Sequence, residues 1–335
     1  MKLEIREQKT MATKDGSQII AIEEHYLDID VDAKVNKMAG GGEKTRKRLL
    51  DLGDLRVKEM DEAGIDIQVL SHCPPGAQAF DPKEAQERAP AVNNRLHKFI
   101  QTKPDRFGGF ATLPTRAPEL AADELERCHK ELGFHGAIVH GLTEGEFIDM
   151  PRFWPIFKRA EALDIPIYIH PGRPHPAVID AYYKDYVEKY RSILSAGWGF
   201  TVETATAGLR MVLSGVFDKY PNLKIILGHM GEGLPFLMWR INHSFGPIIP
   251  NQGEMTGFKD IFTKHFHITT SGNFSDSALL CTMMEMGSDR IIYSVDWPYV
   301  ENTPGTEWLE TLSVSPEDKQ KILNGNAKKL LKMNC

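Results

Sequence analysis

Eight short runs of apolar and β-branched residues alternate with longer amphipathic stretches, and this alternation narrows the choice of fold more than any other feature. The runs predict strands over 18–25, 65–71, 107–113, 135–141, 166–171, 223–229, 265–271 and 290–296. Helices are predicted over 54–63, 82–102, 118–132, 151–163, 198–218, 232–243, 275–286 and 315–332. Eight strands, each followed by a helix, predict an α/β fold of the (β/α)₈ TIM-barrel type. An open doubly wound sheet is the main alternative, but it usually has fewer strands, and no GxGxxG pattern follows a predicted strand.

Two connections are too long to be simple turns. Residues 26–53 and 172–197 follow the first and fifth strands, on the side where a barrel builds its site from extended βα loops. We expect lids or subunit contacts there. Residues 1–17 are polar and are predicted to be an N-terminal extension, and 18–335 are predicted to form one barrel domain.

Composition excludes several classes of function. The chain has 335 residues, with 40 Lys and Arg against 46 Asp and Glu, a net charge of −6 that argues against nucleic-acid binding. No apolar run approaches the roughly 20 residues that cross a bilayer, and the polar start lacks the apolar core of a signal peptide. The cysteines show no CxxC spacing and predict neither a disulfide framework nor a cysteine zinc site; they are Cys73, Cys128, Cys281 and Cys335. A cytoplasmic protein without membrane contact is expected.

Polar residues stand at the carboxyl ends of several predicted strands, where catalysis occurs in a barrel. Glu23 and His25 are two apart on one strand and therefore share a face. Together with His170 and Asp296 they offer two carboxylates and two imidazoles, a normal donor set for Zn²⁺ or Mn²⁺. For any single histidine a buried hydrogen bond is the commoner explanation. The convergence of the set at the ends of strands one, five and eight favours a metal site.

Two further strand ends suggest proton transfer. His229 lies in Gly-His-Met-Gly-Glu-Gly, and Glu232 could accept a hydrogen bond from one ring nitrogen, which is how a catalytic histidine is prepared. The same segment also fits a helix start with an acidic residue at its positive end, and the two interpretations are compatible. Asp296, followed by Trp297, could bind metal, move a proton, do both, or simply cap a turn before Pro298.

Candidate substrate contacts are weaker. His175 could reach substrate from its loop or be solvated there, and Arg240 could hold a carboxylate or form a surface ion pair. His265 and His267 alternate on one strand, and strand packing is their default role. The residues predicted to contact substrate are His140, His175, Arg240, Phe274 and Trp297.

Six segments together carry a resemblance to a known family. They are AIEEHY (21–26), PDRFGGFATLP (104–114), YIHP (168–171), VLSGVFDKYPNLKIILGHMGEGLPFLMWRI (212–241), HFHITTSGNF (265–274) and DRIIYSVDWPY (289–299). The chain resembles the metal-dependent decarboxylase branch of the amidohydrolase superfamily, the group related to aminocarboxymuconate-semialdehyde decarboxylase. Within it, the segments are most similar to the γ-resorcylate and 2,3-dihydroxybenzoate decarboxylases.

The resemblance implies a barrel with one divalent metal per subunit, Zn²⁺ or Mn²⁺ with Mg²⁺ as a further candidate, and no organic cofactor. The implied ligands are Glu23, His25, His170 and Asp296. It also implies that His229, paired with Glu232, lies beside the metal. Members form homodimers or homotetramers in which Arg240 approaches a neighbouring subunit's site. The chain departs from the family at His140, because relatives carry Asn there to contact substrate hydroxyls.

The implied activity is non-oxidative decarboxylation of a hydroxybenzoate such as γ-resorcylate, 2,3-dihydroxybenzoate or a salicylate-like acid, with CO₂ as product and phenol carboxylation as its reverse. Asp296 would protonate the ring carbon that bears the carboxylate, assisted by His229 and Glu232. The alternative is a metal-dependent hydrolase of an ester, lactone or amide. Against it, the first strand carries Glu-x-His rather than His-x-His, and strand four ends without a lysine for a second metal. An inactive barrel is less well supported, because every expected ligand is present.

Overall fold

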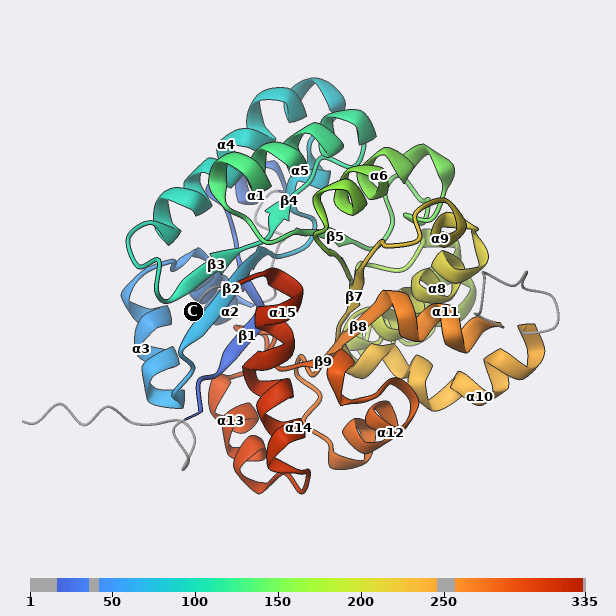
Figure 1. Ribbon diagram of the computed structural model, residues 1–335. Coiled ribbons are helices and arrows are strands. Elements are labelled where there is room, and N and C mark those ends of the chain that lie inside the picture. The colour runs from blue at the N-terminus through green and yellow to red at the C-terminus, as the bar shows by residue number, and fades with distance from the viewer. Residues whose placement is uncertain (1–16, 36–41, 246–256, 334–335) are drawn as a thin grey trace, which may run out of the picture.

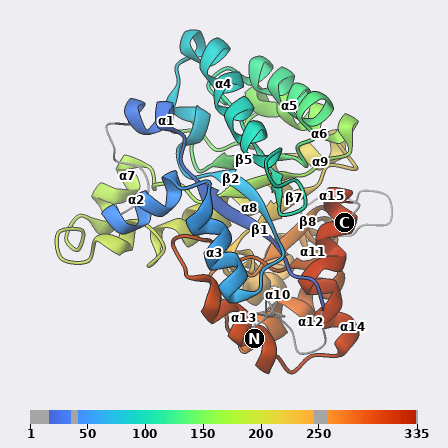
Figure 2. The same ribbon diagram turned by 90° about the vertical axis from the view of Figure 1, so that its left-hand side faces the viewer.

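The computed structural model describes residues 17–35, 42–245 and 257–333. The predicted N-terminal extension, apart from Ser17, and Cys335 lie outside these residues. Figure 1 shows a ring of strands surrounded by helices, and the view in Figure 2 shows the helices covering the ring from the side. The predicted α/β barrel architecture is therefore confirmed.

The strands lie where the alternation predicted them, and all their pairings are parallel. They are β1 (Ile20–Tyr26), β2 (Ile67–His72), β3 (Phe107–Gly109), β4 (Ala111–Thr112), β5 (Ala137–His140), β6 (Ile167–His170), β7 (Ile225–Leu227), β8 (Phe266–Thr269) and β9 (Ile291–Ile292). The predicted third strand is divided at Phe110 into β3 and β4, so the sheets are β1-β2-β3 and β4 to β9. Between β9 and β1 the described residues form a single bridge, Glu24 to Trp297, in place of a regular ladder.

Most helices also begin and end near their predicted bounds, for local reasons. They are α3 (Asp54–Ala63), α4 (Pro82–Ile100), α5 (Pro118–Leu132), α6 (Trp154–Leu163), α8 (Gly199–Leu213), α9 (Val216–Lys219), α10 (Leu234–Phe245), α12 (Asp276–Met286), α14 (Pro316–Gln320) and α15 (Asn326–Leu331). A capping box of Asp81 and Glu84 starts α4. The predicted helix 198–218 is broken at Gly215, whose φ of 78° lies in the left-handed region.

Several helices were not predicted. The two long βα loops contain α1 (Ile29–Lys34), α2 (Glu43–Leu50) and α7 (Pro176–Val178). Two more helices, α11 (Phe258–His265) and α13 (Asn302–Thr311), occupy segments expected to be connections. His265, expected on a strand, therefore ends a helix.

The barrel interior is filled by a cluster of buried apolar residues from alternating strand positions: Ile20, Ile22, Ile67, Val69, Phe110, Ile138, Tyr168, Ile226 and Ile292. Leu330 and Leu331 of α15 belong to the same cluster, and Figure 1 shows α15 lying across one end of the ring. The helix α15 covers that end of the ring. The polar carboxyl ends of the parallel strands gather at the opposite end. No helix in the described part of the chain is long and apolar enough to cross a membrane.

Candidate metal centre and active site

The direction of Glu23 and His25 depends on an irregularity in β1. The register of β1 against β2 shifts between Ala21 and Glu24, as in a β-bulge. Ile20 and Ile22 belong to the interior cluster, and strict alternation would place Glu24 there next. After the bulge, Glu23 and His25 face the barrel interior instead.

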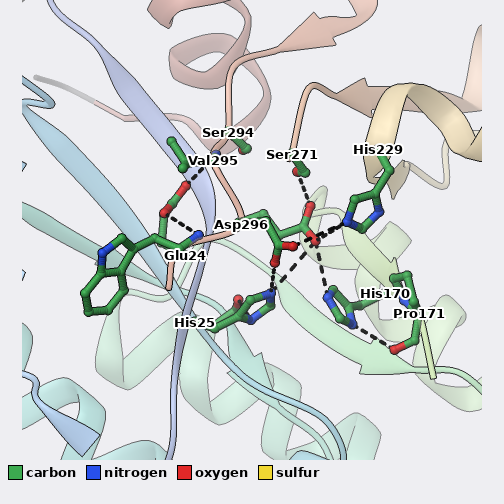
Figure 3. Close-up of polar contacts among 12 residues, drawn as sticks. Glu24, His25, His170, Pro171, His229, Ser271, Ser294, Val295 and Asp296 are labelled. Atoms are coloured by element: carbon green, nitrogen blue, oxygen red, sulfur yellow. Dashed lines mark hydrogen bonds and ion pairs between the residues drawn. The ribbon is translucent and has the colours of Figure 1, made fainter. Parts of the chain in front are cut away.

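The structure brings the predicted metal ligands together. One donor atom from each of Glu23, His25, His170 and Asp296 lies within 4.8 Å of all the others. Glu23 Oε1 is 3.3 Å from His170 Nε2 and 3.9 Å from His25 Nε2, and Asp296 Oδ1 is 3.1 Å from His25 Nε2. Figure 3 shows His25, His170 and Asp296 converging from different strands. Such a group, with two anionic ligands, could hold one divalent cation.

The hydrogen bonds around these side chains leave one atom of each ligand for a metal. His25 Nδ1 lies 3.1 Å from the Ser71 hydroxyl, and His170 Nδ1 lies 2.8 Å from the Pro171 carbonyl oxygen, so both Nε2 atoms point into the cluster. Three buried cluster atoms have no hydrogen-bond partner: Glu23 Oε1, His25 Nε2 and Asp296 Oδ1. Buried polar atoms are almost always paired, and a bound cation would satisfy these three. The residues present therefore fit a divalent metal.

A group of hydroxyls holds the second oxygen of Glu23, and the sequence analysis missed it. Glu23 Oε2 accepts hydrogen bonds from Tyr168, from Ser271 and, at 3.2 Å, from Thr269. Tyr168 precedes His170 by two positions on β6 and shares its face, a signal that could have found it. Because these donors occupy Oε2, Oε1 is the oxygen directed at the metal site.

His229 lies beside the cluster and is oriented by Glu232, as predicted. Its Nδ1 is 2.8 Å from Glu232 Oε1, and its Nε2 is 3.7 Å from Asp296 Oδ2. The chain from His229 to Gly233 has positive φ at every residue, so Glu232 belongs to a left-handed turn and the helix α10 starts only at Leu234. Left-handed backbone costs about 1–2 kcal/mol for each non-glycine residue, and such strain is typical of functional sites.

The surrounding charged groups raise the pKa of His229 and lower the pKa of Asp296. Burial opposes the charged form of His229, but Glu232 and Glu23 hold its pKa well above the ordinary value. Burial raises the pKa of Asp296, yet the neighbouring imidazoles of His229 and His25 keep it below its usual range. Among these protein groups, a proton shared by His229 and Asp296 therefore resides on the imidazole.

His140 lies at the end of β5, next to the cluster. Its Nδ1 is 3.2 Å from His170 Nδ1, and its backbone N–H donates to Gln78 Oε1 at 2.6 Å. Because His170 donates to the Pro171 carbonyl, the matching tautomer of His140 carries its hydrogen on Nε2. That nitrogen is buried without a hydrogen-bond partner, and burial lowers the pKa of His140 well below its ordinary value. A neutral imidazole therefore lies beside the metal site.

The cluster opens into a cavity of about 1040 Å³. Its walls include His140, His170, His229, Glu232 and Asp296 from the strand ends and Arg173 from the loop after β6. The volume exceeds what a single aromatic ring needs, so ring substituents can be accommodated.

Four residues predicted to contact substrate do not line this cavity. Trp297 is buried, lies under the Arg56 guanidinium and donates its indole N–H to Glu59 at 2.7 Å. The other three lie elsewhere: Phe274 packs against Trp308, His175 caps the start of α7, and Arg240 is exposed on α10. The left-handed backbone of Asp296 (φ 72°) explains why the Trp297 side chain points away from the cavity, because it turns the chain just before that residue.

His265 and His267 take the packing roles that were their default. His265 Nδ1 donates to the Leu223 carbonyl at 2.8 Å and its ring stacks on Phe217. Burial lowers the pKa of His265 to about 4 and that of His267 to about 3.

A parallel barrel that gathers two imidazoles and two carboxylates at the carboxyl ends of its strands defines a metal-dependent enzyme. The chain belongs to the amidohydrolase family, whose profile matches residues 29–333. The γ-resorcylate decarboxylase of Polaromonas sp. (strain JS666) is 42% identical over 326 residues, which cover 94% of this chain and 98% of that protein.

Solved structures show the same relationship. A dihydroxybenzoic acid decarboxylase from Polaromonas sp. JS666, with bound manganese and the inhibitor 2-nitroresorcinol, superimposes with a TM-score of 0.86 at 41% identity, covering 95% of this chain and 98% of that one. The 5-carboxyvanillate decarboxylase of Novosphingobium aromaticivorans, in complex with manganese and 4-hydroxy-3-methoxy-5-nitrobenzoic acid, gives a TM-score of 0.87 at 30% identity. In that case the coverage is 96% of this chain and 97% of that one. Metal binding and carbon–carbon lyase chemistry are thus common to these relatives.

Proposed function

We propose that this protein is a metal-dependent, non-oxidative decarboxylase of a hydroxybenzoate in which the carboxylate stands beside a phenolic hydroxyl. The observation that carries the proposal is the Glu23–His25–His170–Asp296 cluster with His229 and Glu232 beside it. The two nitro compounds bound to the relatives support the substrate class, because each carries a nitro group next to a phenolic hydroxyl. A planar nitro group resembles a carboxylate. Since the comparisons are with decarboxylases, the hydrolase alternative is not favoured.

The chemical difficulty is that direct loss of CO₂ would leave an aryl carbanion. Glu23, His25, His170 and Asp296 would hold a divalent cation, which would supply positive charge that favours the phenolate form of the substrate. The electron-rich ring can then accept a proton on the carbon that bears the carboxylate. The carbon–carbon bond breaks, its electron pair restores the aromatic ring, and CO₂ leaves.

Asp296 is the proposed proton donor to the ring carbon, and His229 is the proposed source of that proton. His229 Nε2 and Asp296 Oδ2 are neighbours at 3.7 Å, and a proton passes between them once this gap closes to hydrogen-bond distance or one water bridges it. The raised pKa of His229 means that it holds a proton at neutral pH. Its side chain is 24% exposed, so solvent can restore the proton after each turnover. Glu232 stabilises the charged imidazole throughout.

His140 is the proposed donor to a phenolic oxygen of the substrate, in place of the asparagine expected there. Its buried Nε2 and its position on the cavity wall support this role. The buried surroundings keep the imidazole neutral, so it offers one hydrogen bond and no charge.

The identity of the metal, the oligomeric state, the domain organisation and the cellular location are also proposals. Manganese is the expected metal, with zinc as the alternative that the same donors accept. A homodimer or homotetramer is supported by exposed apolar side chains on the adjacent helices α10 and α12, which are Phe236, Trp239 and Met284. Arg240 lies on the same part of α10 and would approach a neighbouring subunit. Residues 18–335 are proposed to form one domain in a cytoplasmic protein.

A substrate panel tests the proposed function. Manganese-loaded protein is incubated with 2,6-dihydroxybenzoate, 2,3-dihydroxybenzoate, salicylate and simple aryl esters, and CO₂ and acid release are measured separately. We expect CO₂ and the corresponding phenol in equal amounts from at least one hydroxybenzoate. Release of an alcohol from the esters without CO₂ from any hydroxybenzoate would overturn the proposal.

A further inference from the structure

The first and last strands of the barrel meet where the regular ladder is missing, and Asp296 lies at this junction. Asp296 N–H donates to the Glu23 carbonyl at 3.0 Å, and His25 N–H donates to the Trp297 carbonyl at 2.6 Å. These two bonds and the Glu24–Trp297 bridge join β1 to the segment after β9. Asp296 itself has a φ of 72°, a conformation that a non-glycine residue keeps only when its surroundings hold it.

The carboxylate of Glu24 holds the backbone on both sides of Asp296. Its Oε1 accepts the N–H of Val295 at 2.9 Å, and its Oε2 accepts the N–H of Trp297 at 3.2 Å. Figure 3 shows Glu24 directed toward Val295, away from His170 and His229. Glu24 is fully buried, so these bonds are shielded from water.

A buried polar group supports Glu24 from the other side. Gln68 Nε2 donates to Glu24 Oε2 at 3.3 Å, and Arg56 Nη1 donates to Gln68 Oε1 at 3.1 Å. Arg56 is also fully buried, donates to the His25 carbonyl and lies 3.9 Å from the centre of the Trp297 ring. Burial raises the pKa of the Glu24 carboxyl group to about 8, against the opposing effects of the Val295 N–H and of the Arg56 charge.

We propose that Glu24 is a positioning residue that fixes the carboxylate of Asp296 between His25 and His229. Glu24 acts by accepting hydrogen bonds from the two backbone N–H groups that flank Asp296. In a regular ladder, the neighbouring strand would have supplied acceptors for these groups. Gln68, Arg56 and Trp297 hold Glu24 in turn, so Trp297 acts from behind the site rather than on the substrate. An apolar side chain at position 24 would leave both N–H groups buried and unpaired.

The substitution Glu24→Gln tests this inference, which rests on the proposed function for its catalytic readout. The amide is nearly isosteric but presents an NH₂ group to one of the two N–H donors, so one bond is lost. We expect kcat of the metal-loaded variant to fall about 10–100-fold with KM changed less than about threefold. We expect the dissociation constant for manganese to rise about 10-fold, the size typical for an outer hydrogen-bond partner of a ligand.

Glu124→Gln is the matched control. Glu124 is a buried carboxylate on α5 that accepts hydrogen bonds from Asn93 at 2.7 Å and Arg127 at 2.8 Å, away from the metal cluster. The Glu124→Gln substitution should lower Tm while leaving kcat, KM and manganese affinity as in the wild type. If Glu24→Gln behaves in the same way, Glu24 is merely structural and the inference is wrong.

Two further outcomes are distinguishable. If Glu24→Gln does not fold, Glu24→Asp keeps the carboxyl group but shortens the reach, and unchanged kcat and manganese affinity in that variant would also overturn the inference. If the wild type releases no CO₂ from any hydroxybenzoate while Glu24→Gln still weakens manganese binding about 10-fold, the proposed function fails and the positioning role stands.

Discussion

Two sets of histidines in this protein have the same side chain and opposite surroundings. The metal-side histidines, defined as His25, His170 and His229, have Nε2 atoms within 4 Å of the carboxylates of Glu23 or Asp296. The packing histidines, defined as His72 and His265, donate Nδ1–H to backbone carbonyls, of Cys73 at 2.6 Å and of Leu223 at 2.8 Å. The proposed ligands His25 and His170 are as buried as the packing histidines, so burial does not distinguish a ligand from a core residue.

The charge next to the ring makes the difference. For His25, burial lowers the pKa, but Asp296 and Glu23 raise it to about 9. For His72 and His265, burial prevails and the pKa is lowered to about 4. A nitrogen that faces carboxylates and lacks a hydrogen-bond partner is available to a cation, whereas a neutral imidazole with a satisfied hydrogen bond only packs. Substitutions at both kinds of site test this distinction.

The largest effect is expected from Asp296→Asn. The variant loses both the proposed proton donor and one anionic ligand, so kcat should fall by at least about 10³-fold, within the range of general acid catalysis. Substrate binding should be partly retained, as measured by displacement of a nitrophenol inhibitor. Asp149→Asn, which removes the ion pair between the buried Asp149 and the partly exposed Arg210, is the control and should keep its kcat. Near-normal kcat in Asp296→Asn with metal bound would show that the proton comes from elsewhere.

The second prediction compares one histidine from each set. His170→Ala removes a proposed ligand and should weaken manganese binding more than the roughly 10–100-fold typical of an outer partner. His265→Ala removes a stacked ring from Phe217 and should lower Tm while manganese binding stays as in the wild type. Metal content after dialysis against a weak chelator separates the two. Equal loss of manganese in both variants would remove the distinction between the sets.

The third prediction concerns Glu232→Gln. Without this negative charge the pKa of His229 falls, because Glu232 is the main group that raises it. His229 then loses its proton at a lower pH, so the alkaline limb of the kcat profile should shift to lower pH and kcat at neutral pH should drop about 10–100-fold. A pH–rate profile of both proteins measures the shift. An unmoved alkaline limb would mean that His229 does not supply the proton.

The smallest effect concerns stability alone. The pKa of His265 is about 4 in the folded protein and about 6.5 when unfolded, so the unfolded state binds more protons below pH 6.5. The stability contributed by the neutral ring is complete above that pH and is lost progressively toward pH 4. Between pH 7 and pH 5 the wild type should lose about 2 kcal/mol at this site, and His265→Phe should lack that loss. Denaturant unfolding at the two pH values measures it, with kcat unchanged in the variant.

The sequence predicted the strand ends and the metal ligands because barrel geometry brings the carboxyl ends of all strands to one side. It predicted the direction of Glu23 and His25 from simple alternation, although the structure reaches that direction through the bulge after Ala21. His72 shows the limit of the argument, because it also ends a strand but faces away from the cluster. Which face a polar residue takes depends on register, which a pattern of residue types does not contain.

Other features depended on contacts that are distant in sequence. The helix α13 contains Pro304 and Gly305 and has poor local propensity, yet it packs on α3 and Trp308 donates to Asp276 at 2.7 Å. The direction of Trp297 depends on the left-handed backbone of Asp296 and on the carboxylate of Glu59. Local sequence shows neither this backbone conformation nor the contact with Glu59, so Trp297 was wrongly expected to face the substrate.

The central claim is that one divalent metal, held by Glu23, His25, His170 and Asp296, is needed for decarboxylation. The most direct measurement is CO₂ release from 2,6-dihydroxybenzoate as manganese is added back to metal-free protein. We expect no turnover without metal, and a rate of CO₂ release that rises linearly to a plateau at one manganese per chain. CO₂ release by the metal-free protein, or a plateau at a different ratio, would contradict it.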